Sequence, residues 1–360
     1  MRKKHIAAFV SIFIVMGLAA AGYAASATDS GKSKSPLEAV IEAAKKEGTV
    51  TATLKAELKG EGVQRIEEGI KRKYGVDLNI QMQPTGGYPT DLAKAVTEHQ
   101  AGLTPSYDLM TFSTPLMPPV IESGIGEKVD WKPLLEKGTP AEAIQSEGYG
   151  LTEYTGYIGL MYNPKTVREV PQKFSDLTDP KYKGRLFLYS YVENWANYAF
   201  VRGIDKTLAD LRNIMKNSPL VGRYADGLTR YTTGEIDLAV TSSTYFLIAK
   251  DKGVPVEWQS LDVSWPTYHQ MVLRKRAVHP NAAKLLAVFI ASPEAVEIMR
   301  KSGQAGSLLY RGSEEYAIKK KDEERGLKVY LPDKWPGAME FLRSSRATQL
   351  QKEIQQILSR

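Results

Sequence analysis

The 360-residue sequence contains no cysteine and only four histidines. The absence of cysteine excludes disulfide bonds, thiolate metal sites and a lipid-modified cysteine as a membrane tether. The scarcity of histidine leaves few candidates for a general base or a metal ligand. The catalytic motifs G-x-S-x-G and H-E-x-x-H and the Walker A pattern are also missing. These absences argue against a hydrolase, and we expect a protein that catalyses no reaction and needs no cofactor.

The balance of charge gives no sign of a nucleic-acid partner. Charged residues form 25% of the chain, and the formal net charge is +7, part of which comes from Arg2, Lys3 and Lys4. The densest basic clusters, at 274–276 and 319–321, have acidic or apolar neighbours in the sequence. We therefore expect these clusters to be solvated faces rather than a surface for DNA or RNA.

Residues 1–27 have the three-part pattern of a secretory signal peptide. The basic start is followed by a mostly apolar run at 6–21, and residues 25–27 (ASA) match the A-x-A cleavage pattern, with 22–24 as an alternative. The apolar run is short for a membrane span, so we expect cleavage rather than anchoring. No other stretch approaches transmembrane length. The sequence thus predicts an exported, soluble protein in the periplasm of a bacterium with two membranes.

After the leader, strands and helices alternate. We expect helices at 36–47, 60–74, 90–100 and 116–123 and strands at 49–54, 76–82 and 107–112. A second alternating block spans 185–262; 263–273 is a further expected strand, 303–345 is expected to be irregular, and 348–358 is expected to be the last helix. This alternation predicts an α/β fold with a mainly parallel sheet. In such sheets, ligands bind beyond the carboxyl ends of the strands.

Hydroxyl residues follow several of the expected strands. The clearest case is the expected strand 236–240, which runs into Thr241–Ser242–Ser243–Thr244 and then a helical pattern that ends at Gly253. This arrangement presents hydroxyls, backbone N–H groups and the positive end of a helix dipole at one point. The same residues also form an ordinary helix N-cap, and the local pattern leaves both interpretations open.

Three segments resemble the extracytoplasmic solute-binding proteins of ABC importers, in the group that contains ferric-iron, thiamine, polyamine and phosphonate binders. The first is FSDLTDPKYKGR at 174–185, with MYNP at 161–164 before it. The second is HPNAAK at 279–284 with FIASPEA at 289–295, and the third runs from GEID at 234–237 to GVPV at 253–256. Each motif is weak alone, but together they extend the resemblance over essentially the whole mature chain.

The resemblance implies a two-lobed α/β fold of the type II-like periplasmic-binding-protein class, with crossover strands at a hinge and a ligand cleft between the lobes. It places 28–157 and 269–305 in the first lobe, 158–268 in the second, and 306–360 against both. It also implies a monomer that delivers a small molecule to an ABC permease in the inner membrane. A ligand sensor for a membrane receptor would use the same fold.

The hydroxyl-bearing strand ends favour a small organic or phosphorus oxyanion as the ligand. Hydroxyls at helix N-termini would donate to its oxygens, a lysine would add positive charge, and aromatic rings would cover the organic body. The expected ligand-binding residues are Lys55, Glu57, Ser113, Thr114, Tyr157, Ser190, Tyr191, Trp195, Ser242, Ser243, Thr244 and Tyr245.

Ferric iron is an alternative ligand. In the ferric binders that this chain resembles, two adjacent tyrosines bind the metal through their phenolates. The matching positions here are Tyr245 and Phe246, so one phenolate is missing. Glu57 adds one carboxylate, but Fe³⁺ prefers several hard anionic oxygens. No metal site is therefore favoured, and Tyr245 is the expected ligand if iron binds.

Two further alternatives stay open at this stage. Glu57, Glu193 and Asp226 together with Trp195 would suit a polyamine, since carboxylates and an aromatic face both attract ammonium groups. We rank this ligand below the oxyanion. An exported hydrolase is the main enzyme alternative, and it ranks last because the motifs are absent.

Overall fold

The first helix forms where its capping residues predict it. In the computed structural model, which describes residues 34–84, 87–303, 305–332 and 334–359, α1 spans Pro36–Glu47. Ser35 Oγ accepts from Glu38 N, and the Glu38 carboxylate accepts from Ser35 N at 2.7 Å, which completes a capping box. Gly48 ends the helix with a φ of 65°, a value that glycine adopts without strain. The expected signal peptide, residues 1–27, lies outside the described residues.

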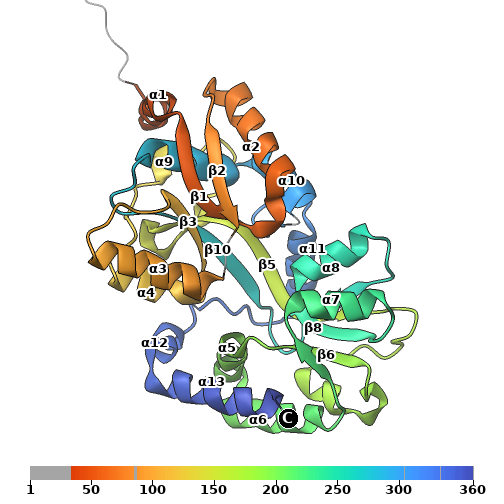
Figure 1. The fold of residues 1–360 in the computed structure, drawn as a ribbon. Coiled ribbons are helices and arrows are strands. Elements are labelled where there is room, and N and C mark those ends of the chain that lie inside the picture. The colour runs from red at the N-terminus through yellow and green to blue at the C-terminus, as the bar shows by residue number, and fades with distance from the viewer. Residues whose placement is uncertain (1–33, 85–86, 304, 333, 360) are drawn as a thin grey trace, which may run out of the picture. The chain divides into compact units, whose positions relative to one another are not determined.

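Strands and helices alternate along the compact unit Ser35–Arg360 (Figure 1). Its strands are β1 (Thr49–Leu54), β2 (Asn79–Pro84), β3 (Leu109–Ser113), β4 (Ile144–Gln145), β5 (Gly150–Tyr162), β6 (Leu186–Tyr189), β7 (Leu220–Gly222), β8 (Leu238–Ser242), β9 (Glu257–Gln259) and β10 (Pro266–Leu273). The helices after α1 are α2 (Lys59–Tyr74), α3 (Tyr88–Gln100), α4 (Met117–Glu122), α5 (Val192–Arg202), α6 (Ile204–Met215), α7 (Tyr224–Thr232), α8 (Ser243–Asp251), α9 (Pro280–Ile290), α10 (Pro293–Gly303), α11 (Glu314–Glu324), α12 (Ala338–Arg343) and α13 (Ser345–Leu358). Among the described helices, none combines the length and apolarity that a membrane crossing requires.

The strands form a mixed sheet in the order β2-β1-β3-β10-β5-β8-β6-β7, with β4 and β9 also paired to β5. At one end, β1 is parallel to β2 and to β3, and at the other end β6 is parallel to β7 and to β8. Between these parallel groups, β10 and β5 pair with antiparallel neighbours. Parallel pairing is found at both ends of the sheet, but the expectation of a mainly parallel sheet is wrong, because the central strands β5 and β10 pair only with antiparallel neighbours.

Strand β5 connects the two parallel groups. Its residues Leu151–Tyr157 pair with β10, and Ile158–Tyr162 pair with β8 and β9. All of its residues are buried, as expected for a strand covered on both faces. In Figure 1, β5 runs from the elements around β10 to those around β8.

The buried apolar side chains form three hydrophobic clusters. The first cluster lies around β1, β2, α2, α9 and α10 and includes the start of β5. The second cluster lies around the end of β5, β6, β8, α5, α6, α8 and α13. The third and smallest cluster lies under α3 and α4. Helices α5, α6 and α13 lie side by side over the second cluster (Figure 1).

The expectation that 303–345 is irregular is wrong, because this stretch contains α11 and α12. The buried positions of α11 are Glu315, Ile318 and Asp322, which have helical spacing. Two of these three residues are acids, so the buried face of the helix has no apolar pattern to detect. Ser313 caps the helix, since its hydroxyl accepts from Tyr316 N at 3.0 Å.

Candidate functional site

The turn after β1 carries two of the expected site residues. Lys55 is buried, and its ammonium group lies 3.0 Å from the Glu57 carboxylate and 4.6 Å from the centre of the Tyr154 ring. The Glu153 carboxylate holds the turn in place, because it accepts from the Lys55 backbone N at 2.8 Å and from Thr111 Oγ1 at 2.7 Å. Burial raises the pKa of Glu153 to about 7. A carboxyl group on β5 thus fixes the backbone of this turn.

The end of β3 carries Ser113 and Thr114. Thr114 is buried, donates to the Tyr268 carbonyl oxygen at 3.3 Å and accepts from Gln270 Nε2 at 2.9 Å. Ser113 is half-buried, and its hydroxyl has no hydrogen-bond partner among the described residues. Ser113 is therefore the hydroxyl at this strand end that is free to contact a solute.

The hydroxyl run at 241–244 forms no loop, because β8 ends at Ser242 and α8 begins at Ser243. Ser242 Oγ accepts from Thr244 N at 3.3 Å and so caps α8. Ser243 is fully buried; its hydroxyl accepts from Tyr157 N at 3.0 Å and lies 3.4 Å from a Glu315 carboxylate oxygen. The capping interpretation of this run is correct. Whether Ser242, Ser243 or Thr244 also contacts a solute stays a prediction.

Tyr245 and Phe246, which follow this run, differ in burial. Tyr245 is half-buried, whereas Phe246 is 5% exposed and packs against Trp258 at a ring distance of 5.8 Å. The residue expected to match the second tyrosine of the ferric binders, Phe246, is therefore a core side chain. Among the described residues, no group of three or more His, Cys, Asp and Glu side chains is arranged to hold a metal ion.

Tyr191 and Ser190 follow β6. The Tyr191 ring lies 4.8 Å from the Tyr224 ring, and Tyr224 lies 5.6 Å from Tyr245, so these three half-buried tyrosines form one aromatic surface. Ser190 N donates to the Gly222 carbonyl oxygen at 2.8 Å, and its half-exposed hydroxyl has no partner in the part of the chain that the structure describes.

Two of the expected aromatic residues lie in the second cluster. Trp195 is 1% exposed, donates through Nε1 to the Tyr189 carbonyl oxygen at 2.8 Å and stacks on the Tyr189 ring at 4.3 Å. Tyr157 is also 1% exposed. Either residue would reach a solute only after its surroundings change, and their assignment to the site stays a prediction.

One electrostatic interaction relates expected site residues beside the two main clusters. Burial, and then the negative charge of Glu57, raises the pKa of Tyr245 to about 12. Glu57 belongs to the turn beside the first cluster, and Tyr245 belongs to α8 beside the second. Arg223, which precedes α7, carries a positive charge that acts on both Tyr191 and Tyr245. We refer to the region around Lys55, Glu57 and Tyr245 as the junction.

Three residues of the junction were missed by sequence reasoning, namely Tyr88, Tyr154 and His269. The Tyr154 ring stacks on the His269 ring at 4.1 Å, and Tyr88 Oη lies 2.8 Å from His269 Nδ1. They belong to α3, β5 and β10, which are far apart in sequence. No local signal in the sequence would have brought them together, because their proximity depends on the strand order.

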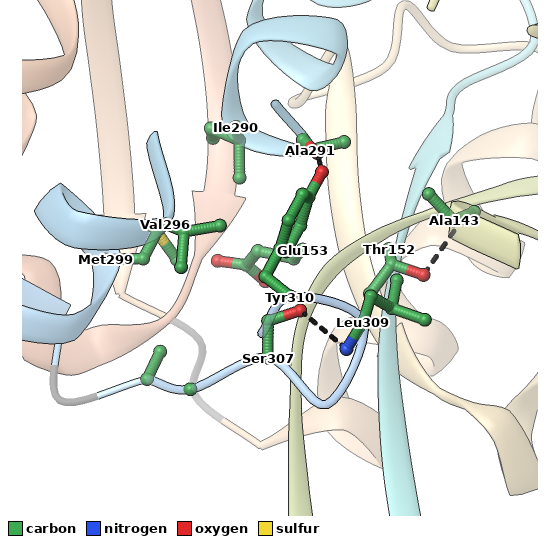
Figure 2. Close-up of a pocket in the computed structure, with 12 residues that line it drawn as sticks. Ala143, Thr152, Glu153, Ile290, Ala291, Val296, Met299, Ser307, Leu309 and Tyr310 are labelled. Carbon is green, nitrogen blue, oxygen red and sulfur yellow. Dashed lines mark hydrogen bonds between the residues drawn. The ribbon is translucent and has the colours of Figure 1, made fainter. Parts of the chain in front are cut away.

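A small cavity lies behind the junction, beside Glu153 and Tyr310 (Figure 2). It has about 10 Å³ of space open to water, enough for roughly one water molecule. Tyr310 extends across it and donates to the Ala291 carbonyl oxygen at 2.6 Å. This cavity is too small for an organic solute.

Comparison with known proteins identifies the family. The family model for bacterial extracellular solute-binding proteins matches residues 104–338, more than half of the chain. This chain is a bacterial extracellular solute-binding protein. The solute-binding protein matches no curated protein in sequence.

Solved structures share the fold of this solute-binding protein. The substrate-binding protein of the ABC transporter from Agrobacterium tumefaciens has a TM-score of 0.70 at 15% identity, covering 86% of this chain and 94% of its own. The apo ferric ion-binding protein A of Pasteurella haemolytica has a TM-score of 0.65 at 17% identity, covering 86% and 98%. The periplasmic binding protein AfuA of Actinobacillus pleuropneumoniae, solved with exogenous fructose-6-phosphate, has a TM-score of 0.62 at 19% identity, covering 87% and 99%. The expected two-lobed periplasmic-binding-protein fold is confirmed.

Proposed function

We propose that this solute-binding protein captures a small solute at the junction and delivers it to an ABC permease in the inner membrane. The observation that carries the proposal is the electrostatic interaction of Glu57, in the turn after β1, with the Tyr245 hydroxyl on α8, which relates the two main clusters. A solute held between them would contact both sides at once, so binding would favour the closed arrangement of the lobes. The protein would act by binding, without turnover of the solute.

The favoured solute is a small organic molecule that carries a phosphate or carboxylate group. Lys55 and Arg223 would donate to such a group, since each pairs with one carboxylate, Glu57 and Asp226 respectively, and has further N–H donors. The hydroxyls of Ser113, Ser190 and Tyr245 have no partner among the described residues and are available as donors. The tyrosine surface next to them would cover an organic body. The structure of AfuA with fructose-6-phosphate supports the proposal, because a phosphorylated sugar fits this fold.

A polyamine is less well supported. Its carboxylate partners would be Glu57 and Asp226, but Glu57 is 3.0 Å from Lys55 and Asp226 is 3.3 Å from Arg223. A polyamine would place its ammonium groups next to both of these cations, which repel it. Iron is not better supported, because Phe246 is in the core and burial raises the pKa of Tyr245, which disfavours the phenolate.

The proposed arrangement of lobes follows the two main clusters. We propose that 28–157 and 269–305 form the first lobe, 158–268 the second, and that 306–360 packs against both, with β5 and β10 as crossover strands. The protein would be a periplasmic monomer after removal of residues 1–27. A sensory role remains the alternative to transport, and a neighbouring gene for a permease would favour transport.

The test combines native mass spectrometry of the purified protein with a thermal-shift screen of phosphates, carboxylates, polyamines and metal ions. We expect a co-purified or stabilising organic oxyanion, since a ligand that binds only the folded state raises its stability. Stabilisation by polyamines alone would contradict the proposed solute class. A visible charge-transfer band on adding ferric citrate would instead support iron bound by Tyr245.

A further inference from the structure

His269 lies in the middle of a row of side chains that crosses three strands. On β10, it is directly opposite Ser113 of β3 and Tyr154 of β5. Residues directly opposite each other in antiparallel strands project from the same face of the sheet. The Tyr154 ring stacks on the imidazole at 4.1 Å with an interplanar angle of 7°, and Lys55 lies over the same Tyr154 ring. The row therefore runs from Ser113, whose hydroxyl has no partner among the described residues, through His269 to Tyr154, the ring that Lys55 covers.

A chain of hydrogen bonds fixes the position of the imidazole proton. Tyr88 Oη lies 2.8 Å from His269 Nδ1 and 3.2 Å from Tyr154 Oη. A neutral imidazole has one donor nitrogen and one acceptor nitrogen. The acceptor nitrogen is a better acceptor than a phenol oxygen, and a phenol is a better donor than a neutral imidazole N–H. Tyr88 therefore donates to Nδ1 and accepts from Tyr154, which places the imidazole proton on Nε2.

Burial and the charge of Lys55 keep the imidazole neutral. Burial, and then the positive charge of Lys55, lowers the pKa of His269 to about 3. The carboxylates near this group are Glu57 in the turn after β1, Glu153 on β5 and Asp91 on α3; all three act on Tyr88, whose pKa is raised chiefly by burial. Glu57 and Glu153 are held by Lys55 and Thr111 respectively, so neither forms an ion pair with the imidazole.

We propose that the Nε2–H group of His269 donates a hydrogen bond to the bound solute beside Lys55, and that it selects an anionic oxygen over an amine. This inference rests on the proposed function and names one of its specificity-determining contacts. Nε2 has no partner among the described residues, and the side chain is only half-buried. An anionic oxygen would accept from both Nε2–H and the Lys55 ammonium group. A protonated amine has no lone pair to offer, so it would leave the N–H unpaired and meet a like charge.

The first test is an NMR measurement of the histidine tautomer in the ¹⁵N-labelled protein, titrated with inorganic phosphate, fructose 6-phosphate and spermidine. Loss of one imidazole signal in His269→Asn assigns the residue. We expect the Nε2–H tautomer, and a shift of its Nε2 signal with either oxyanion but not with spermidine. The opposite tautomer overturns the inference. An unmoved Nε2 signal, while Tyr245 signals respond to the oxyanion, overturns the inference and leaves the proposed function standing. If neither the His269 nor the Tyr245 signals shift when either oxyanion is added, both the inference and the proposed function are overturned.

The second test separates solute contact from mere positioning. In His269→Asn, the amide reaches the Nδ1 position and keeps the bond to Tyr88, but no atom occupies the Nε2 position. In His269→Gln, the amide nitrogen reaches the Nε2 position. We expect His269→Asn to weaken fructose 6-phosphate binding by roughly 10- to 100-fold, the range for a hydrogen bond to a charged group. His269→Gln should retain most of the affinity. If His269→Asn and His269→Gln lost the same affinity for fructose 6-phosphate, and both unfolded at the wild-type temperature, the inference would be overturned.

Discussion

Arg300 donates to both carboxylate oxygens of Asp251, each at 2.8 Å, and this ion pair joins α10 of the first cluster to α8 of the second. The bond lowers the pKa of Asp251. The side chains are 27% and 46% exposed, so water weakens the pair. Because α8 also carries Tyr245, the pair connects the first cluster to the helix that faces the junction.

We expect Asp251→Asn to weaken binding of the solute found by the thermal-shift screen by about two- to fivefold. The reason is that a partly exposed ion pair contributes on the order of 0.5–1 kcal/mol, and we expect this pair to form only when solute binding closes the lobes. Isothermal titration calorimetry at low and high salt measures the effect, which should disappear at high salt. Glu297→Gln is the matched control, since Glu297 pairs with Lys301 at 2.7 Å within α10 itself. Equal affinities in Asp251→Asn and wild type at low salt would contradict the prediction.

Tyr245→Phe should reduce solute affinity by roughly 3- to 10-fold and leave the free energy of unfolding within about 0.5 kcal/mol of wild type. The Tyr245 hydroxyl has no protein partner among the described residues, so its removal costs the folded state little. Calorimetry and urea denaturation measure the two quantities.

Tyr231→Phe is the control, because Tyr231 Oη donates to the Pro255 carbonyl oxygen at 2.8 Å. It should show the opposite result, with a loss of about 1 kcal/mol in stability and unchanged affinity. If Tyr245→Phe behaved like Tyr231→Phe, Tyr245 would be a structural residue and α8 would not contribute its hydroxyl to the site.

The elements whose buried face is apolar were predictable from the sequence. The prediction of α1 at 36–47 and β1 at 49–54 is confirmed to the residue, because periodicity, capping residues and glycine stops agree there. The strand expected at 236–240 is real but runs two residues later, as Leu238–Ser242. Helix α11 was missed because its buried face contains two acids.

The candidate site was predictable only at the strand ends. Ser113 and Lys55 follow strands that are visible in the sequence, so they could be proposed without knowing the sheet order. His269 and Tyr154 meet only because β10 lies between β3 and β5. The pairing of β10 with β5 joins segments separated by more than a hundred residues. Nothing in the local sequence of either strand indicates which strand it pairs with. The sequence therefore predicts which turns face the site but not which residues of the crossover strands join them.

The stability of the protein should fall as pH rises through the range in which Glu315 loses its proton. Burial raises the pKa of Glu315 from the ordinary 4.5 to about 7. Between these values the folded state binds more protons than the unfolded state, so the free energy of unfolding decreases as pH rises. The full penalty is present above pH 7 and absent below about pH 4.5. Glu153, whose pKa is also raised to about 7, contributes in the same direction.

Glu315→Gln should flatten this dependence, because an amide remains neutral throughout. We expect the variant to be more stable than wild type at pH 8, by on the order of 2–3 kcal/mol, and similar to it at pH 4.5. Urea denaturation at several pH values measures the difference. Glu324→Gln, at an exposed position of the same helix, is the control and should leave the pH dependence unchanged. A wild-type stability that rises between pH 5 and 7 would contradict the assigned direction of the pKa shift.

Gly306 allows Glu315 to approach the backbone where the chain returns to β5. A Cβ atom at Gly306 would overlap the Glu315 carboxylate, and the Gly306 carbonyl oxygen accepts from Thr155 N at 3.0 Å. Gly306→Ala should therefore destabilise the protein by roughly 2–4 kcal/mol, since either the acid or the strand pairing must move. In a Glu315→Ala background the same substitution should cost at least 1 kcal/mol less, because the overlap is gone.

Gly60→Ala is the control, because nothing lies within 4 Å of the added Cβ on α2, and it should instead stabilise the helix by about 0.5–1 kcal/mol. Urea denaturation of the four proteins of the cycle measures the coupling, and additive losses would show that Glu315 is not what excludes a side chain at Gly306.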